Sequence, residues 1–290
     1  MSVHLYTVSW NEADMLGFFF RHYDSWVDRY VFYDDGSTDE TLAMLRAHPR
    51  VEVRRLERTD PASYVASSAA MRNHAWKESR GTAEWIVIVD VDEHVCVPGM
   101  TMRDYLRQCR RRRVSLLHGM GFQMISEDFP APHELLCATR TIGAPYARES
   151  KLSIFDPLAV DETTFGLGRH MARPRGRLRL PWRDRLLLLH YKYVGFERLY
   201  QRHRFLKTGL RKNDLRKEWA KQYDWSRERL RQDWELFARA AVDVAVEGFD
   251  ARRCHRNRRW WRPAWKIKRR LGLVSRRDLH LPRSHTSWAS

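Results

Sequence analysis

The sequence predicts an α/β fold with a mostly parallel central sheet flanked by helices, followed by a C-terminal helical region. Short apolar runs bounded by polar clusters recur in the N-terminal third, and such runs are typical of buried strands. These runs alternate with stretches of helical periodicity, which favours a sheet covered on both faces. Polar and acidic residues gather where the runs end, and ligands of such sheets bind at the carboxyl ends of strands.

In the first half of the chain, we expect strands at 3–8, 51–56 and 85–90. Residues 29–45, "RYVFYDDGSTDETLAML", have the pattern of a strand, a polar turn and a helix. A further helix is expected over 62–80, because Gly81 is a suitable C-terminal stop.

In the second half, 114–125 and 185–194 have the composition of strands, and the glycines and prolines between them indicate long loops. Residues 196–210 are amphipathic, and Ser226 can cap a long helix that continues to about Glu247. We therefore divide the chain into an α/β domain (1–195), a helical extension (196–250) and a basic tail rich in tryptophan (251–290).

The run "WIVIVDVDEHV" (85–95) leads from a buried strand straight into acidic residues. If the strand continues through the run, Asp90 and Asp92 point to the same face. Two carboxylates on one face repel each other, and burying them unpaired would cost several kcal/mol per ion. We therefore expect a positive charge between them. Asn11, Asp34 and Asp35 also fall at predicted strand ends.

The charge of the chain is concentrated at its C-terminus. The net charge is +17, and residues 251–290 contain thirteen Lys or Arg and one acid (Asp278), so +12 belongs to the tail and +5 to the rest. The four cysteines lack CxxC spacing, which argues against a zinc site and a disulfide framework. No secretory signal or apolar run of about 20 residues is visible, so we expect a reduced, cytoplasmic protein.

Four motifs, in this order, resemble glycosyltransferase family 2 proteins of GT-A (Rossmann-like) fold: "VSWNEADML", "YDDGSTDET", "MRNHAW" and "VDVDEHV". The resemblance covers roughly the first 100 residues and continues more loosely through "ESKLSIFDP" and "LLHYKYVG", which look like a bacterial branch. It implies a metal-dependent hexosyltransferase that moves a sugar from a nucleoside diphosphate donor, by family habit a UDP-sugar, to an acceptor hydroxyl with inversion. The expected setting is envelope or capsular polysaccharide synthesis, with a glycan or lipid-linked acceptor.

The resemblance also implies a donor site. Asn11 and Glu12 would line the base pocket, Asp34 or Asp35 would pair with an imide N–H of a pyrimidine, and Arg72 and Asn73 would approach the nucleotide. The expected donor-binding set is completed by Asp90 and by Lys151, which we expect to contact phosphate.

Asp90 and Asp92 form a DxD-type motif for Mn²⁺ or Mg²⁺, which prefer oxygen ligands and are commonly shared between carboxylates and substrate phosphates. Asp92 is our choice for direct contact, and His190 would complete the site, with His170 as its competitor. An inverting transfer also needs a carboxylate base near the acceptor. Asp128 is the first candidate, ahead of Glu127, and the others are Glu149, Asp161 and Glu162.

The tail interleaves arginine with Trp260, Trp261 and Trp265, which suits an anionic membrane surface at the inner face of the membrane. A solvated extension and a nucleic-acid-binding segment are the alternatives for this tail. For the whole chain, the alternatives are a nucleic-acid-binding protein that acts through the tail and a sugar nucleotidyltransferase. The second alternative normally has a glycine- and arginine-rich phosphate loop near its start, which "VSWNEADML" lacks. We therefore expect a nucleotide-sugar donor and no nucleic acid.

Overall fold

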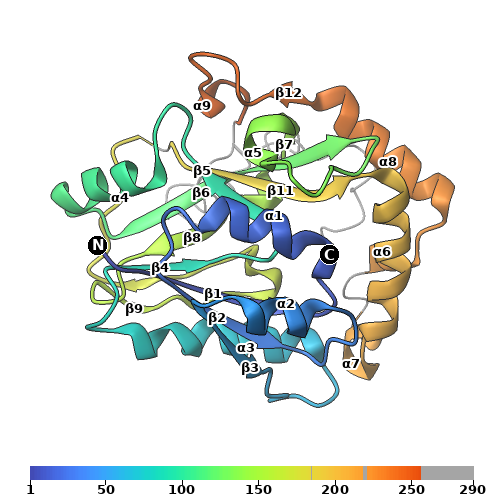
Figure 1. Cartoon of the computed structure of the whole chain (residues 1–290), viewed down its shortest axis with the longest axis horizontal. Helices are drawn as coiled ribbons and strands as arrows, with labels where there is room; N and C mark the ends of the chain where they lie inside the picture. The colour runs from blue at the N-terminus through green and yellow to red at the C-terminus, as the bar shows by residue number, and fades with distance from the viewer. Residues whose placement is uncertain (184, 218–220, 256–290) are drawn as a thin grey trace, which may run out of the picture.

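The computed structural model describes residues 1–183, 185–217 and 221–255 of the chain. Its centre is a mixed sheet with helices packed around it (Figure 1). Four neighbouring strands run in parallel in the order β4-β1-β2-β3, with bounds β1 Val3–Ser9, β2 Arg29–Asp34, β3 Val51–Arg55 and β4 Trp85–Ile88. Every residue of β1 is buried, because this strand lies in the middle of the sheet with helices on its faces.

The sheet continues beyond β4 through antiparallel pairs and one parallel pair. The remaining strands are β5 Glu93–Cys96, β6 Leu116–Ser126, β7 Ile142–Pro145, β8 Lys151–Phe155, β11 Leu187–Val194 and β12 Val242–Asp243. Strand β8 links β4 to β6, β11 pairs in parallel with β6, and β5 pairs in antiparallel with β11. Two short strands, β9 Val160–Glu162 and β10 Arg175–Gly176, form a separate hairpin-like pair.

The α-helices of the described residues cover this sheet and extend it at the C-terminal side. They are α1 Ala13–Tyr23, α2 Thr41–Ala47, α3 Tyr64–His74, α4 Met102–Arg111, α5 Leu136–Thr139, α6 Phe196–Gly209, α7 Lys212–Arg216, α8 Arg227–Ala240 and α9 Ala251–Cys254. Short 3-10 turns are η1 Ala75–Ser79, η2 Ala147–Glu149, η3 Leu167–Arg169 and η4 Lys221–Asp224. The predicted α/β class, with helices flanking the sheet and a helical C-terminal region, is confirmed (Figure 1).

The helix expected at 62–80 forms as α3 followed by η1. The Ser63 side chain accepts a hydrogen bond from the Ala66 N–H at its start, and Gly81 has φ +83° after its end. The helix predicted to run from Ser226 to about Glu247 is too long. It ends at Ala240, because Val242 and Asp243 pair with β7 and the Val244 N–H donates to Thr141 O.

The strand predicted through residue 90 also ends early. Strand β4 stops at Ile88, and the chain turns at 90–93, where the Glu93 N–H donates to Asp90 O (3.0 Å). The turn lets the chain pair next with β11 instead of continuing along β1. The sequence-based prediction that alternation along one strand points Asp90 and Asp92 to the same face therefore does not apply, because both residues lie in this turn.

The tail is described only as far as α9 and residue 255. The tryptophans at 260, 261 and 265, and with them the predicted membrane-binding face, lie outside the described residues. Across the described ranges, we find no helix with the length and apolar character that crossing a bilayer requires.

Candidate functional site

Asp90 is held by two arginines from distant segments. Arg72 of α3 is buried, and its Nη2 donates to Asp90 Oδ1 (2.5 Å) while its Nη1 donates to Ser68 Oγ (2.7 Å). Arg169 Nη2, from η3, lies 4.0 Å from Asp90 Oδ2. Burial alone would raise the pKa of Asp90, but Arg72 and Arg169 outweigh it and hold that pKa well below its usual range. Asp90 is therefore a fixed anion.

A buried ion network lies under the Asp90–Glu93 turn. Glu93 is fully buried and accepts hydrogen bonds from Lys151 Nζ (2.6 Å), from Arg169 and from the Asp90 N–H (3.0 Å). Lys151 Nζ also lies 2.6 Å from Glu149 Oε2. Arg169, which has no exposed surface, donates through Nη1 to Ile88 O (2.6 Å). The positive charge that the sequence argument required is thus supplied largely by the protein's own side chains.

Asp92 differs from the other carboxylates near the turn in the kind of side chain that pairs with it. The carboxylates of Asp90, Glu93 and Glu149 are matched by the cations of Arg72, Lys151 and Arg169. The partner of Asp92 is instead an imidazole, since its Oδ2 lies 3.4 Å from His190 Nε2. Burial raises the pKa of Asp92, but His190 more than offsets this and lowers it below its usual value.

Gln123 of β6 fixes the tautomer of His190. The Gln123 Nε2 donates to the backbone oxygen of His190 (2.9 Å), so its Oε1, 2.8 Å from His190 Nδ1, is an acceptor. Nδ1 therefore carries a proton, and Nε2 faces Asp92. Burial disfavours the charged ring, but Asp92 and Glu149 outweigh it and raise the pKa of His190 above its usual value.

The side chains of Asp92 and His190 are of the types that bind a divalent cation. Carboxylate oxygen and imidazole nitrogen both suit Mn²⁺, and a ligating histidine typically donates its other N–H to a fixed acceptor, as His190 does to Gln123. Among the described residues, no group of three or more His, Cys, Asp or Glu side chains is arranged to hold a metal on its own. Further ligands would have to come from elsewhere, such as substrate phosphates.

Asn11 and Glu12 lie in the loop between β1 and α1, and hydrogen bonds connect this loop to α6. Arg202 donates to the Asn11 backbone oxygen (2.6 Å) and to Glu12 Oε1. The Asn11 side chain joins this loop to the next one, because its Oδ1 accepts from the Thr38 N–H (2.6 Å). Burial and the nearby Asp92 raise the pKa of Glu12 to about 7, and Arg202 acts in the opposite direction.

The doubled acid Asp34-Asp35 serves two different contacts. Asp34 accepts from the N–H groups of Gly36 (2.8 Å) and Ser37 (2.9 Å) and from Ser37 Oγ (2.5 Å), so it stabilises its own turn. Asp35 accepts from Arg58 Nε (2.8 Å) and forms a second bond to Arg58 Nη2. Asp34 therefore stabilises the turn and also accepts from Ser9 Oγ of β1 (3.3 Å), whereas Asp35 is paired with an arginine.

Two expected donor-binding residues have other contacts. The Asn73 amide holds the segment before η3, since its Nδ2 donates to Phe165 O (3.1 Å) and its Oδ1 accepts from the Phe165 N–H (2.7 Å). Lys151 is enclosed between Glu93 and Glu149 and is only 3% exposed. Both side chains thus have partners within the protein, and Lys151 is enclosed by two carboxylates.

The acid pair after β6 is not joined to the Asp90–Asp92 turn by any hydrogen bond or ion pair of the described residues. Glu127 is exposed and forms a bidentate ion pair with Arg231 of α8 (2.7 Å and 2.7 Å). Asp128 is exposed, and within the described ranges its carboxylate has no such partner. Among the other base candidates, Glu149 is paired with Lys151 and Glu162 with Lys77 (2.6 Å).

His170, the competitor of His190, lies at the edge of the network. Its Nδ1 lies 3.0 Å from Arg148 O and 3.8 Å from Glu149 Oε1. Among the described residues, it forms no hydrogen bond or ion pair with Asp90 or Asp92. Its neighbour Arg169 is the residue that reaches the turn. Arg169, Gln123 and Arg202 were not predicted from the sequence, although His170, the residue next to Arg169, was a candidate ligand.

Comparison with known proteins assigns the chain to a family. Residues 7–233 match the model of glycosyltransferase family 92, and this range contains the whole cluster around Asp90 and Asp92. No curated protein sequence matches the chain. The predicted membership of family 2 is not confirmed, because family 92 is a distinct family.

The similarities to solved structures are weak. Glucosyl-3-phosphoglycerate synthase from Mycobacterium tuberculosis, in complex with Mn²⁺, UDP and glucosyl-3-phosphoglycerate, is 17% identical with a TM-score of 0.28 over 42% of this chain and 44% of that one. The chain thus spans less than half of the synthase.

Two further structures are similar at the same level. The 4-diphosphocytidyl-2C-methyl-D-erythritol synthase from Anaerococcus prevotii is 9% identical, with a TM-score of 0.29 over 54% of this chain and 71% of that one. HddC from Yersinia pseudotuberculosis is 8% identical, with a TM-score of 0.26 over 66% and 77%. The family match covers most of the chain, and on that basis the protein belongs to glycosyltransferase family 92.

Proposed function

We propose that the protein transfers a sugar from a nucleoside diphosphate donor, first of all a UDP-sugar, to an acceptor hydroxyl with inversion, and that it uses Mn²⁺ or Mg²⁺. The observation that carries this proposal is the unequal charge balance of the acidic turn. Asp90 is neutralised by arginine, whereas Asp92 faces an imidazole nitrogen at 3.4 Å. When bound there, the cation would neutralise negative charge on the departing nucleoside diphosphate.

The side chains around the turn would hold the donor in place. Arg72 and Arg169 keep Asp90 ionised and oriented, so that it can accept hydrogen bonds from the donor. Asn11, Glu12 and Asp35 belong to the two loops at the ends of β1 and β2, where we place the base and ribose. Arg202 links this part of the site to α6, so the helices after Gly195 support donor binding.

For the base that accepts the acceptor's proton, we propose Asp128. Glu127 is already neutralised by Arg231, while the Asp128 carboxylate has no partner in the described part of the chain. Glu12 is the second candidate: Arg202 pairs with it, but burial still raises its pKa to about 7, and a base works best when its pKa is near the operating pH. Asp128→Asn and Glu12→Gln, compared through their pH–rate profiles, would tell the two apart.

The acceptor and the location of the protein are proposed from the sequence. We propose a glycan or lipid-linked acceptor of an envelope or capsular polysaccharide, in the cytoplasm or at the inner face of the membrane. We also keep the division into 1–195, 196–250 and 251–290 as a proposal. No described contact bears on the tail beyond residue 255.

A thermal-shift experiment tests the proposed site. A ligand at a hundred times its dissociation constant stabilises a protein by roughly 2.7 kcal/mol. UDP should therefore raise the melting temperature in the presence of Mn²⁺, and Asp92→Ala and His190→Ala should lose this metal-dependent increase. Glu247→Ala, which removes an exposed carboxylate elsewhere, is the control. Full Mn²⁺-dependent stabilisation of Asp92→Ala would contradict the proposal.

The products distinguish sugar transfer from the nucleotidyltransferase alternative. Sugar transfer releases a nucleoside diphosphate, whereas nucleotidyl transfer from a nucleoside triphosphate releases pyrophosphate. Release of UDP from UDP-sugars, with no pyrophosphate formed from UTP and a sugar phosphate, is the expected result. The reverse pattern would favour the alternative.

A further inference from the structure

Six exposed arginines gather beside the C-terminal end of α4, and we call them the arginine face: Arg111, Arg112, Arg113, Arg179, Arg183 and Arg185. Hydrogen bonds between Ser115 and Arg179 join the two segments that carry these arginines. The Ser115 N–H donates to Arg179 O (2.8 Å), and the Arg179 N–H donates to Ser115 Oγ (2.7 Å). Arg112 and Arg185 both lie close enough to the Cys109 thiol to act on it electrostatically.

In the part of the chain that the structure describes, no acidic side chain pairs with the arginine face. None of its six guanidinium groups has an ion pair or hydrogen bond with another described residue. Arginines on the same helix behave differently, since Arg103 pairs with Asp28 (3.0 Å) and Arg110 with Asp156 (2.8 Å). The arginine face is therefore a concentrated positive charge open to an anionic partner.

Apolar side chains lie among these arginines. Trp182 is 93% exposed, and Leu178 is 39% exposed. A tryptophan left almost wholly in water is a notable exception among large apolar side chains, and such exposure often marks an interaction site. Tryptophan is also enriched where one side of a surface is apolar and the other is wet, as at the headgroup level of a membrane.

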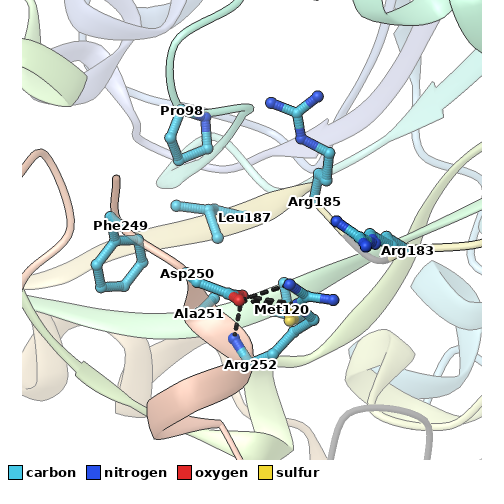
Figure 2. A pocket seen from close by; sticks show the side chains of 9 residues that line it. All are labelled: Pro98, Met120, Arg183, Arg185, Leu187, Phe249, Asp250, Ala251 and Arg252. Carbon is cyan, nitrogen blue, oxygen red and sulfur yellow. Dashed lines mark hydrogen bonds and ion pairs between the residues drawn. The ribbon is translucent and has the colours of Figure 1, made fainter. Parts of the chain in front are cut away.

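A recess of about 170 Å³ opens next to Arg183 and Arg185 (Figure 2). Its apolar lining includes Leu187 and Phe249. The third arginine of the recess, Arg252, is bound by Asp250 (2.6 Å), as the dashed lines in Figure 2 show. Arg183 and Arg185 are therefore the arginines of the recess that have no acidic partner among the described residues. The volume is several times the roughly 30 Å³ that one water occupies in the liquid, so it has room for a phosphate group.

We propose that the arginine face docks the protein onto an anionic phospholipid membrane. The guanidinium groups contact lipid phosphates, with one phosphate in the recess beside Arg183 and Arg185, and Trp182 inserts at headgroup level. A nucleic acid would satisfy the arginines too. However, its phosphate backbone offers nothing to Leu178, which the boundary between headgroups and acyl chains would accommodate, so the membrane is the better fit.

Docking in this way leaves the proposed donor site open. Ser115 lies just before β6, while Gln123, which contacts His190, lies eight residues further along the chain. At about 3.3 Å per residue, the two are roughly 26 Å apart. In Figure 1, α4 lies at the left side of the molecule and α6 and α7 at the right. Membrane docking can therefore be disproved without contradicting the proposed sugar transfer, and the reverse also holds.

The test compares two full-length variants that lose the same charge. Arg112→Gln, Arg183→Gln and Arg185→Gln are combined in one variant, and the control combines Arg204→Gln, Arg216→Gln and Arg229→Gln, which are exposed on α6, α7 and α8. Binding is measured by co-sedimentation with phosphatidylcholine vesicles with and without phosphatidylserine. From about 1 kcal/mol per arginine near the surface, the first variant should bind anionic vesicles roughly a hundredfold more weakly, and the control should bind nearly as the wild type does.

A second pair of variants tests the apolar contribution. Trp182→Ser should weaken vesicle binding even at high salt, where charge contributions are screened, and Leu215→Ser, an equally simple loss of an exposed apolar residue on α7, should not. All variants should keep the thermal stability of the wild type and the effect of UDP with Mn²⁺. Unchanged binding by the first triple variant, equal losses in both triples, or binding to an RNA oligonucleotide but not to vesicles would each overturn the proposal.

Discussion

Replacing Lys151 by methionine should destabilise the protein strongly without acting through substrate. Lys151 is 3% exposed, and its ammonium group lies 2.6 Å from both Glu93 and Glu149. Methionine has a similar volume but no charge, so the variant leaves Glu149 without its main partner and Glu93 with Arg169 alone. The sequence had predicted a phosphate contact for this lysine, and the two roles lead to different measurements.

The structure sets the size of the effect. Removing one partner of a buried ion pair typically costs about 3–5 kcal/mol, because an uncompensated charge stays behind. For a chain of this length, roughly 2 °C per kcal/mol gives a loss of roughly 6–10 °C in melting temperature. Lys207→Met is the control, since Lys207 pairs with Asp224 in solvent and such pairs contribute less than about 1 kcal/mol.

The loss should also depend on pH. Burial raises the pKa of Glu149, but Lys151 and its neighbours outweigh this and hold that pKa well below its usual range. A carboxyl group with a lowered folded pKa contributes stability above its unfolded pKa of about 4.3, and this contribution disappears as the pH falls through the folded pKa. The variant lacks that contribution, so its deficit should be full at neutral pH and should shrink below about pH 4.

Urea unfolding at neutral pH and at about pH 3 measures both effects. Adding Glu149→Gln to Lys151→Met should recover part of the lost stability, because it removes the stranded charge. The reasoning is refuted if Lys151→Met loses less than about 1 kcal/mol while the stabilisation by UDP disappears. That outcome would instead support the phosphate contact.

Burial lowers the pKa of His22 to about 4, so unfolding takes up a proton, and the free energy of unfolding should fall by up to about 3 kcal/mol between pH 6.5 and 4. His22→Gln should flatten this part of the dependence of the unfolding free energy on pH, measured with urea. An unchanged slope would show that His22 does not cause the decrease. Arg202→Met removes the cation beside Glu12, so the pKa of Glu12, followed by NMR titration, should rise above 7. Arg231→Gln should change stability by less than about 1 kcal/mol in thermal unfolding, because its pair with Glu127 is exposed; a larger loss would show that the pair is structural.

The elements that the sequence predicted well are those with a local signal. The strands β1, β3 and β6 follow from short apolar runs, and α6 follows from its amphipathic period. The ends of elements were less predictable. Strand β4 stops at Ile88 and α8 at Ala240, because pairing with β11 and β7 takes over, and pairing partners distant in the chain leave no mark on the local pattern.

The same distinction applies to the site. Asp90, Asp92 and His190 were predicted because acids and a histidine directly after apolar runs are visible locally. Arg169 was missed, because one arginine in a loop looks like any solvated charge. Only the fold shows that it is fully buried and bound to Glu93, a residue 76 positions earlier. Burial of a single charged side chain is a tertiary property, so the sequence assigned Lys151 to phosphate and overlooked its carboxylate partners.

The ion network also explains how the acidic turn can exist before any substrate binds. Two carboxylates in one turn that depended on a cation from solution would separate in its absence. Here the turn is held by groups that are always present: the Glu93 carboxylate accepts from the Asp90 N–H, and Arg169 and Lys151 neutralise Glu93. Asp92 stands outside this set of contacts: its partner is the His190 imidazole, and among the described residues no arginine or lysine forms an ion pair with it. A carboxylate arranged in this way can bind a cation with little reorganisation, and its removal should leave the fold intact, whereas removal of Glu93 should not.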